Sequence, residues 1–226
     1  MKLKTALFLV MNGFASLTSS MAQSNIIQIS NQQKKVAITY SSAESKLAAE
    51  ILYSYLEKSL PNTFEIKDKN ITKSDAQIIL EIQKNNKELK DQEFILKSNS
   101  QDISLLATNL KSLKYAVYTL LEKWEFRKFT ATVSYIPKPD AFIFPKNFYQ
   151  KYQPTFAYRT LLYPDSYDQA FREWHKLDWF NDDFGLWGHT FDRLVPPKTH
   201  FKTNPKLYAL YEGKRRAESL CMTNDT

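Results

Sequence analysis

One glycine-flanked stretch presents the side chains most suited to contact a ligand. Trp187 and His189 lie within 185–193, where two of the four glycines of the chain flank the tryptophan. Glycine allows backbone conformations that other residues resist, so this spacing predicts a shaped loop that presents an indole face and an imidazole. The alternative is a turn that buries the tryptophan. The choice between a ligand-presenting loop and a buried turn depends on the segments before and after this stretch.

Several other kinds of chemistry are excluded by residue type. A single cysteine, Cys221, allows neither an intramolecular disulfide nor a thiolate metal cluster. The three histidines lack a tight metal-binding spacing, and residues 14–184 contain no glycine, which excludes glycine-rich phosphate loops. The adjacent Asp182 and Asp183 fit loop or helix-cap acids better than a catalytic pair. We therefore expect no metal and no cofactor.

Length and charge set the broad class. The 226 residues suffice for one large domain or two small ones, and the 43% hydrophobic content suffices for a core. The formal net charge is +7, and it falls to +5 without Lys2 and Lys4. The basic residues are scattered and form no arginine-rich run, which favours a solvated surface over a nucleic-acid interface. We expect no nucleic-acid partner.

Residues 1–22 have the pattern of a secretory signal peptide. A short positive segment precedes an apolar run, and Ser20 and Ala22 supply the small residues of a cleavage site before Gln23. The apolar run is too short to span a membrane stably. We therefore expect an exported protein of the bacterial periplasm, cell surface or exterior, without a membrane span.

Residues 23–140 predict an α+β domain, a sheet with two helices on one face. The expected helices cover about 43–60 and 110–124, where apolar residues recur at helical spacing. The expected strands are 26–29, 36–40, 64–66, 76–82, 93–96 and 102–107. Acids and lysines alternate with apolar residues here, as on solvated faces, so we expect no catalytic group in this domain.

The composition changes after residue 128, where prolines punctuate an aromatic stretch. Because this proline density blocks regular helix and central strand, we predict an extended connector at 141–153. The following pattern is that of an opening parallel α/β unit. Its expected elements are a strand at Phe156–Leu162, a helix at about 167–177, a short helix at Leu207–Tyr211 and a strand at Ser219–Met222.

Several segments resemble bacterial glycosidases. Leu113–Glu122 resembles the helix that closes the domain ahead of the catalytic barrel in α-glucuronidases and β-N-acetylhexosaminidases, and Pro154–Arg159 resembles their first barrel strand. Four later segments are similar to one group, large exported bacterial proteins that carry an uncharacterised domain and are classed with the glycoside hydrolases. These segments are Trp187–Phe191, Asn204–Leu210, Gly213–Arg215 and Leu220–Asn224.

The chain departs from the family pattern at two places. Glu125–Phe129 stands where a Gly-Cys-Arg-Trp type segment is usual and keeps only the arginine and an aromatic residue. Asn204–Lys206 stands where His-Pro-Glu is usual.

The resemblance implies two domains. An α+β accessory domain at 23–140 and the connector at 141–153 would be followed, at 154–226, by the opening strands and helices of a (β/α)8 barrel. A complete barrel takes about 250 residues. We therefore expect an incomplete barrel in this chain.

The resemblance also implies sugar-binding roles. The guanidinium of Arg159 is expected to hold two ring hydroxyls or a uronate carboxylate, with a structural ion pair as the alternative. Trp187 is expected to stack on a sugar and His189 to hydrogen-bond a hydroxyl, and Asp165 is a further candidate contact. The catalytic acid pair of such barrels lies on a later strand, so we expect no catalytic residue in this chain.

These expectations define one main function. We expect the N-terminal part of an exported glycoside hydrolase that acts on polysaccharide or glycan, inactive by itself, with carbohydrate as its ligand. The alternative is a secreted, non-catalytic carbohydrate-binding or surface protein. A charge-driven nucleic-acid or membrane binder is a third reading, and it requires a one-sided patch of lysine and arginine.

Overall fold

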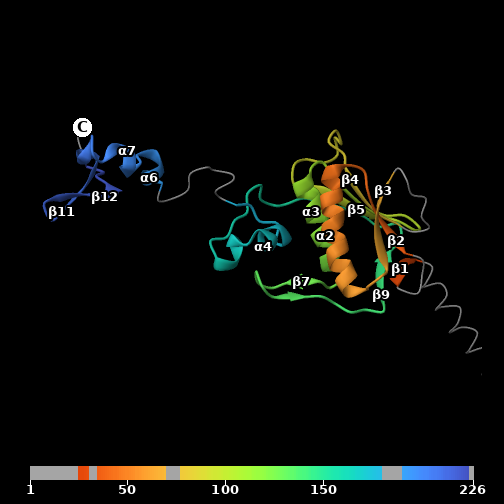
Figure 1. Cartoon of the computed structure of the whole chain (residues 1–226). Helices are drawn as coiled ribbons and strands as arrows, with labels where there is room; N and C mark the ends of the chain where they lie inside the picture. The colour runs from red at the N-terminus through yellow and green to blue at the C-terminus, as the bar shows by residue number, and fades with distance from the viewer. Residues whose placement is uncertain (1–24, 31–34, 70–76, 180–189, 224–226) are drawn as a thin grey trace, which may run out of the picture. The chain divides into compact units, whose positions relative to one another are not determined.

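The chain forms two compact units that divide between Leu177 and Asp178. The computed structural model describes residues 25–30, 35–69, 77–179 and 190–223 (Figure 1). Trp187 and His189, the two side chains singled out in the glycine-flanked stretch, lie outside the described residues, as do Asp182 and Asp183.

A six-stranded mixed sheet forms the centre of the first unit. Its strands run in the order β10-β5-β6-β4-β2-β3. Their bounds are β2 Val36–Tyr40, β3 Phe64–Asp68, β4 Gln77–Ile82, β5 Phe94–Ser98, β6 Ile103–Ala107 and β10 Tyr149–Tyr152. Strands β3 and β4 each pair in parallel with β2, and β6 pairs in parallel with β4. Strand β5 is antiparallel to β6, and β10 is antiparallel to β5. The unit is therefore a mixed α/β structure.

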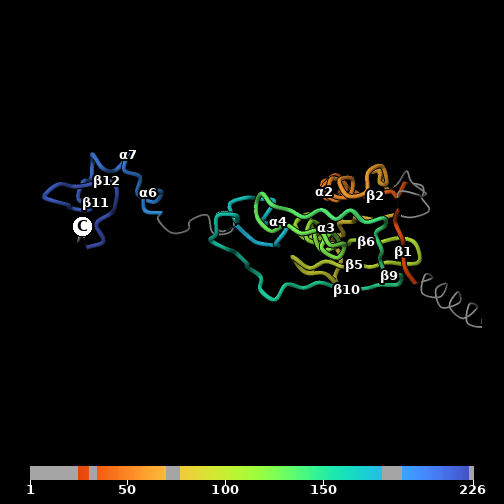
Figure 2. The backbone as a smooth tube through the Cα atoms, turned by 90° about the horizontal axis from the view of Figure 1, so that it is seen from below, coloured from red at the N-terminus to blue at the C-terminus, as the bar shows by residue number. Residues whose placement is uncertain are grey.

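Two helices pack side by side against this sheet (Figures 1 and 2). Helix α2 (Ala43–Ser59) begins at Ser42, whose hydroxyl accepts a hydrogen bond from the Ser45 amide. Helix α3 (Leu110–Lys123) begins at Asn109, whose side chain accepts from the Ser112 amide. Such caps satisfy amides that have no partner inside the helix. The apolar faces of both helices and alternate strand residues form one core.

A small two-stranded sheet closes one end of this core. Strand β1 (Ile26–Ser30) pairs antiparallel with β9 (Ala141–Pro145). Phe142 on β9 stacks on Trp124 at a centroid distance of 4.7 Å. The predicted connector thus contains two strands, β9 and β10. Pro145 is the last residue of β9, where it interrupts no further pairing.

A short hairpin and a helix complete the first unit. The hairpin consists of β7 (Arg127–Lys128) and β8 (Ser134–Tyr135). After β10 come the 3-10 turn η1 (Pro164–Tyr167) and helix α4 (Gln169–Trp174). Trp174 anchors α4, because its ring lies 5.4 Å from that of Tyr55 on α2 and 5.2 Å from that of Tyr118 on α3.

The strand predicted at Phe156–Leu162 is wrong, because this segment has no strand structure. Side chains, and not a neighbouring strand, donate hydrogen bonds to two of its backbone carbonyls. The Phe156 carbonyl accepts from the Arg159 guanidinium, and the Leu161 carbonyl accepts from the Ser166 hydroxyl. The structure of the described residues after 153 thus shows no opening of a barrel.

The second unit contains short helices and a hairpin (Figure 1). Its elements are α6 (Phe191–Leu194), α7 (Pro197–His200), η2 (Pro205–Leu207), β11 (Tyr208–Tyr211) and β12 (Lys214–Leu220). The helix predicted at Leu207–Tyr211 is wrong. Glu212 and Gly213 both have positive φ, 48° and 74°, which is typical of the tight two-residue turn of a β-hairpin. The second strand is longer and begins earlier than predicted.

Among the described helices of both units, none is sufficiently long and apolar to cross a membrane.

Candidate functional site

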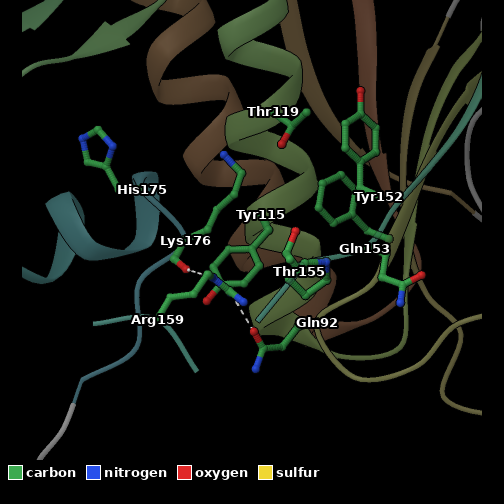
Figure 3. A pocket seen from close by; sticks show the side chains of 11 residues that line it. Gln92, Tyr115, Thr119, Tyr152, Gln153, Thr155, Arg159, His175 and Lys176 are labelled. Atoms are coloured by element: carbon green, nitrogen blue, oxygen red, sulfur yellow. Dashed lines mark hydrogen bonds between the residues drawn. The ribbon is translucent and has the colours of Figure 1, made fainter. Parts of the chain in front are cut away.

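The first unit contains a half-open cavity of about 310 Å³ (Figure 3). This size falls within the range of small-molecule sites. The lining comes from the loop before β5, from α3, from the end of β10 and the segment after it, and from the end of α4. The lining residues are Gln92, Phe94, Tyr115, Thr119, Tyr152, Gln153, Pro154, Thr155, Arg159, His175 and Lys176.

Arg159 holds one wall of this cavity together. Its Nη2 donates to Gln92 Oε1 at 2.7 Å, and its Nε donates to the Lys176 carbonyl at 2.9 Å. The guanidinium also lies 5.9 Å from the centroid of the Tyr115 ring. Arg159 is thus a fixed part of the wall. Of the two predicted site residues that the structure describes, Arg159 and Asp165, only Arg159 lines the cavity.

Aromatic rings form a second wall. Phe94 and Tyr152 stack with centroids 4.7 Å apart and planes only 11° from parallel. The register of the sheet explains this contact, because the two residues are directly paired between β5 and β10. The Tyr152 hydroxyl donates to Gln150 Oε1 at 2.8 Å. A stacked pair is stiff and offers a flat apolar surface, which suits a small ligand site.

Helix α3 contributes Tyr115 and Thr119 to the lining. Residues four apart lie on the same face of a helix, so both side chains reach the cavity. Thr119 is only 7% exposed, and its Oγ1 has no hydrogen-bond partner among the described residues. Thr119 is thus a buried polar group that the surrounding protein leaves unsatisfied.

The basic side chains at the lining are engaged by the protein. Lys176 Nζ lies 3.0 Å from Glu122 Oε2 in an ion pair. A ring nitrogen of His175, Nε2, lies 2.9 Å from the Lys128 carbonyl, so this nitrogen carries the proton and donates. Among the described residues that line the cavity there is no aspartate and no glutamate. The chemistry offered to a ligand is therefore that of hydroxyls, amides and aromatic faces.

Asp165 does not line the cavity. Its Oδ1 accepts a hydrogen bond from the Ala131 amide at 2.9 Å. It thereby ties the turn η1 to the loop between β7 and β8. This contact gives Asp165 a structural role, and no contact in the described residues points to a ligand role.

Most of the lining residues were not predicted from the sequence. Gln92, Tyr115, Thr119 and Tyr152 come from three separate segments that only the tertiary structure brings together. One signal was present. Tyr115 and Thr119 lie beside the apolar stripe of α3, yet both are buried, and polar residues next to such a stripe mark a face that contacts something other than the sheet.

The second unit has its own groove, of about 800 Å³. Asp192 and Glu218 both contribute to it, and both are exposed to solvent. No group of His, Cys, Asp and Glu in the described parts of either unit has a metal-binding arrangement. We therefore treat the cavity of the first unit as the candidate site.

Comparison with known proteins gives a family match for part of the chain. Residues 128–226 match a family described as a domain of unknown function, DUF4838. No curated protein matches the chain.

Solved structures similar to the chain include three glycoside hydrolases. A GH20 exo-β-N-acetylglucosaminidase from Vibrio harveyi is 18% identical, with a TM-score of 0.40 over 59% of this chain and 18% of that one. A GH115 4-O-methyl-α-glucuronidase with specificity for decorated arabinogalactans is 17% identical, with a TM-score of 0.42 over 60% and 19%. A GH138 enzyme targeting pectin rhamnogalacturonan II is 11% identical, with a TM-score of 0.32 over 41% and 10%. The chain thus spans less than one fifth of the length of each.

Proposed function

We propose that this chain is the sugar-binding front part of an exported glycoside hydrolase, without the catalytic acid pair. One observation carries the proposal. The cavity combines aromatic faces, amides and hydroxyls, and none of the described residues that line it is an acid. Glycoside hydrolysis needs two carboxyl groups about 5 to 9.5 Å apart across the scissile bond. The described lining can therefore hold a sugar but supplies no carboxyl group to cleave one.

The binding groups of this site are already held in place by the fold. The stack of Tyr152 on Phe94 fixes one face, and the bonds of Arg159 to Gln92 and Lys176 fix another. A ligand that enters has little side-chain motion to restrict, and this lowers the entropic cost of binding. Arg159 acts here mainly as a positioning residue.

The proposal includes the features that lie outside the described residues. Residues 1–22 would direct export to the bacterial periplasm, cell surface or exterior. Trp187 and His189 would contact sugar from a separate loop. A barrel domain that carries the acid pair would lie beyond residue 226.

The test is sugar binding and turnover by the purified full chain after removal of residues 1–22. We expect binding of glycans on an array and in calorimetry, and no turnover of aryl glycosides. Tyr152→Ala should abolish binding, because it removes the aromatic wall. Tyr149→Ala is the matched control, since Tyr149 lies on the same strand but is exposed and does not line the cavity. Turnover by the chain, or a failure to bind any glycan, would refute the proposal.

A secreted, non-catalytic carbohydrate-binding protein is the second candidate, because a cavity without acids among its described lining residues fits it equally well. The two candidates differ in what the gene encodes beyond codon 226. A reading frame that continues for some hundreds of codons and supplies a barrel with an acid pair favours the first. A stop codon at that position favours the second.

A further inference from the structure

The Thr119 hydroxyl has the properties of a ligand-contacting group. Thr119 is 7% exposed, and no described residue hydrogen-bonds its Oγ1. Figure 3 shows this oxygen directed toward the space between Tyr115 and Tyr152. A buried hydroxyl without a partner is destabilising. A ligand that hydrogen-bonds it in this cavity removes that penalty.

The charges at the cavity indicate which class of ligand fits. Lys176 is paired with Glu122, and three nitrogens of the Arg159 guanidinium donate to protein oxygens. An acidic ligand would have to compete with these contacts. The imidazole of His175 is engaged by the Lys128 carbonyl. The remaining polar groups among the described lining residues are amides and hydroxyls, which include Gln153 and Thr155. A hydroxyl both donates and accepts hydrogen bonds, so these groups suit hydroxyls of an uncharged ligand.

We infer that the cavity takes one uncharged sugar ring, and that a ring hydroxyl hydrogen-bonds Thr119 Oγ1. The inference rests on the proposed function and narrows its ligand from glycans in general to neutral sugar units. Thr119 is then a specificity-determining residue. A site that hydrogen-bonds a substrate hydroxyl rejects an analogue without it, because the protein group is left unpaired.

The experiment is calorimetric titration of the full chain with methyl glycosides of neutral hexoses, and with methyl glucuronide as the acidic probe. Thr119→Val keeps the shape of the side chain but removes the hydroxyl. We expect it to weaken the best neutral glycoside about tenfold. Thr119→Ser keeps the hydroxyl and should bind within about threefold of the unmodified chain.

Thr39→Val is the matched control. Thr39 is fully buried on β2, and its Oγ1 likewise has no hydrogen-bond partner among the described residues, but it does not line the cavity. The same chemical change should therefore leave the affinity unaltered. Thermal denaturation of all three variants verifies that they fold before they are titrated.

The possible outcomes separate this inference from the proposed function. Absence of binding to every neutral and acidic glycoside contradicts the proposed function and the inference together. Neutral binding that Thr119→Val leaves unchanged overturns the inference alone. Tighter binding of the glucuronide than of every neutral glycoside overturns the assignment to uncharged sugars. Tenfold weaker binding of a neutral glycoside by Thr119→Val, with unchanged affinity of Thr39→Val, supports the inference.

Discussion

Arg159 and Gln92 are joined by a hydrogen bond across 67 residues of sequence. Arg159 Nη2 donates to Gln92 Oε1 at 2.7 Å, and Gln92 Nε2 donates in turn to the Ala157 carbonyl at 2.8 Å. Gln92 adopts a left-handed backbone, with φ at 64°, a conformation that costs a non-glycine residue about 1 to 2 kcal/mol. These contacts hold the segment after β10 against the α/β layer and form a wall of the cavity.

Replacing Arg159 with lysine should loosen this wall. The variant keeps the charge but loses the planar fork that contacts Gln92 and Lys176. We expect the free energy of unfolding to fall by about 1 to 3 kcal/mol, and amide exchange of residues 153–159 to accelerate. Urea denaturation and hydrogen–deuterium exchange measure the two effects. Arg193→Lys, at an exposed position of α6, is the control, and equal exchange in both variants would contradict the role given to Arg159.

Trp174→Ala should release α4 from the core. The indole is 2% exposed and packs on Tyr55 and Tyr118. Loss of so large a buried side chain costs about 3 to 5 kcal/mol, and α4 should become a site of proteolytic cleavage. Limited proteolysis followed by mass spectrometry locates the cut. Trp174→Phe, which fills part of the space, should have a smaller effect.

The same variant has a spectroscopic readout. Burial, and then the charges of Glu173 and Tyr55, raise the pKa of Tyr118 well above its ordinary value of 10.0. When α4 leaves, water and solvent ions reach this phenol, so its pKa should return toward that value. An ultraviolet titration of tyrosinate at high pH follows the change. An unaltered titration curve in a folded Trp174→Ala variant would show that α4 does not cover Tyr118.

Periodicity predicted the elements whose packing is set by a single apolar face. The helices expected at 43–60 and 110–124 agree with α2 (Ala43–Ser59) and α3 (Leu110–Lys123). The apolar residues of each recur at helical spacing, and that face packs on the sheet. For these helices, local pattern and tertiary packing require the same structure.

The sequence pattern gave a wrong prediction where side-chain hydrogen bonds or a turn determine the backbone conformation. At Phe156–Leu162 an apolar run resembles a strand, but Arg159 and Ser166 bind its carbonyls. At Leu207–Tyr211 the following glycine resembles a helix end, but Glu212 and Gly213 form a hairpin turn. The cavity itself was beyond local pattern, because Gln92 meets Arg159 only through the tertiary fold.

Stability should depend on pH through Glu93. Burial alone would raise the pKa of this carboxyl, but hydrogen bonds from the Lys90 amide at 2.8 Å and from the Lys151 ammonium at 2.9 Å lower it below the ordinary 4.5. Because the folded pKa is lower than the unfolded one, the stabilisation is complete above the unfolded pKa. It is lost as the pH falls through the folded pKa.

Glu93→Gln tests this pH dependence. Urea denaturation between pH 7 and pH 3 should show a flatter profile for the variant, because an amide does not titrate. At pH 7 the variant should be less stable by about 1 to 3 kcal/mol, since Lys151 loses its charged acceptor. Glu65→Gln removes a carboxylate from a pair with Lys67 that is open to solvent, and should leave the profile in place. A profile unchanged by Glu93→Gln would assign the acid sensitivity to other groups.

A substitution at the end of α3 should stabilise the protein. The Phe126 amide donates to the Leu121 carbonyl and the Glu125 amide donates to the Glu122 carbonyl, a pattern that ends helices with a left-handed residue, usually glycine. Here that residue is Glu125, with φ at 68°. Glu125→Gly should therefore raise the free energy of unfolding by about 0.5 to 1 kcal/mol. Glu50→Gly is the control, because it makes the same change within α2, where it should lower the free energy of unfolding by about 1 kcal/mol. An equal loss of stability in both variants would show that the left-handed backbone at Glu125 carries no penalty.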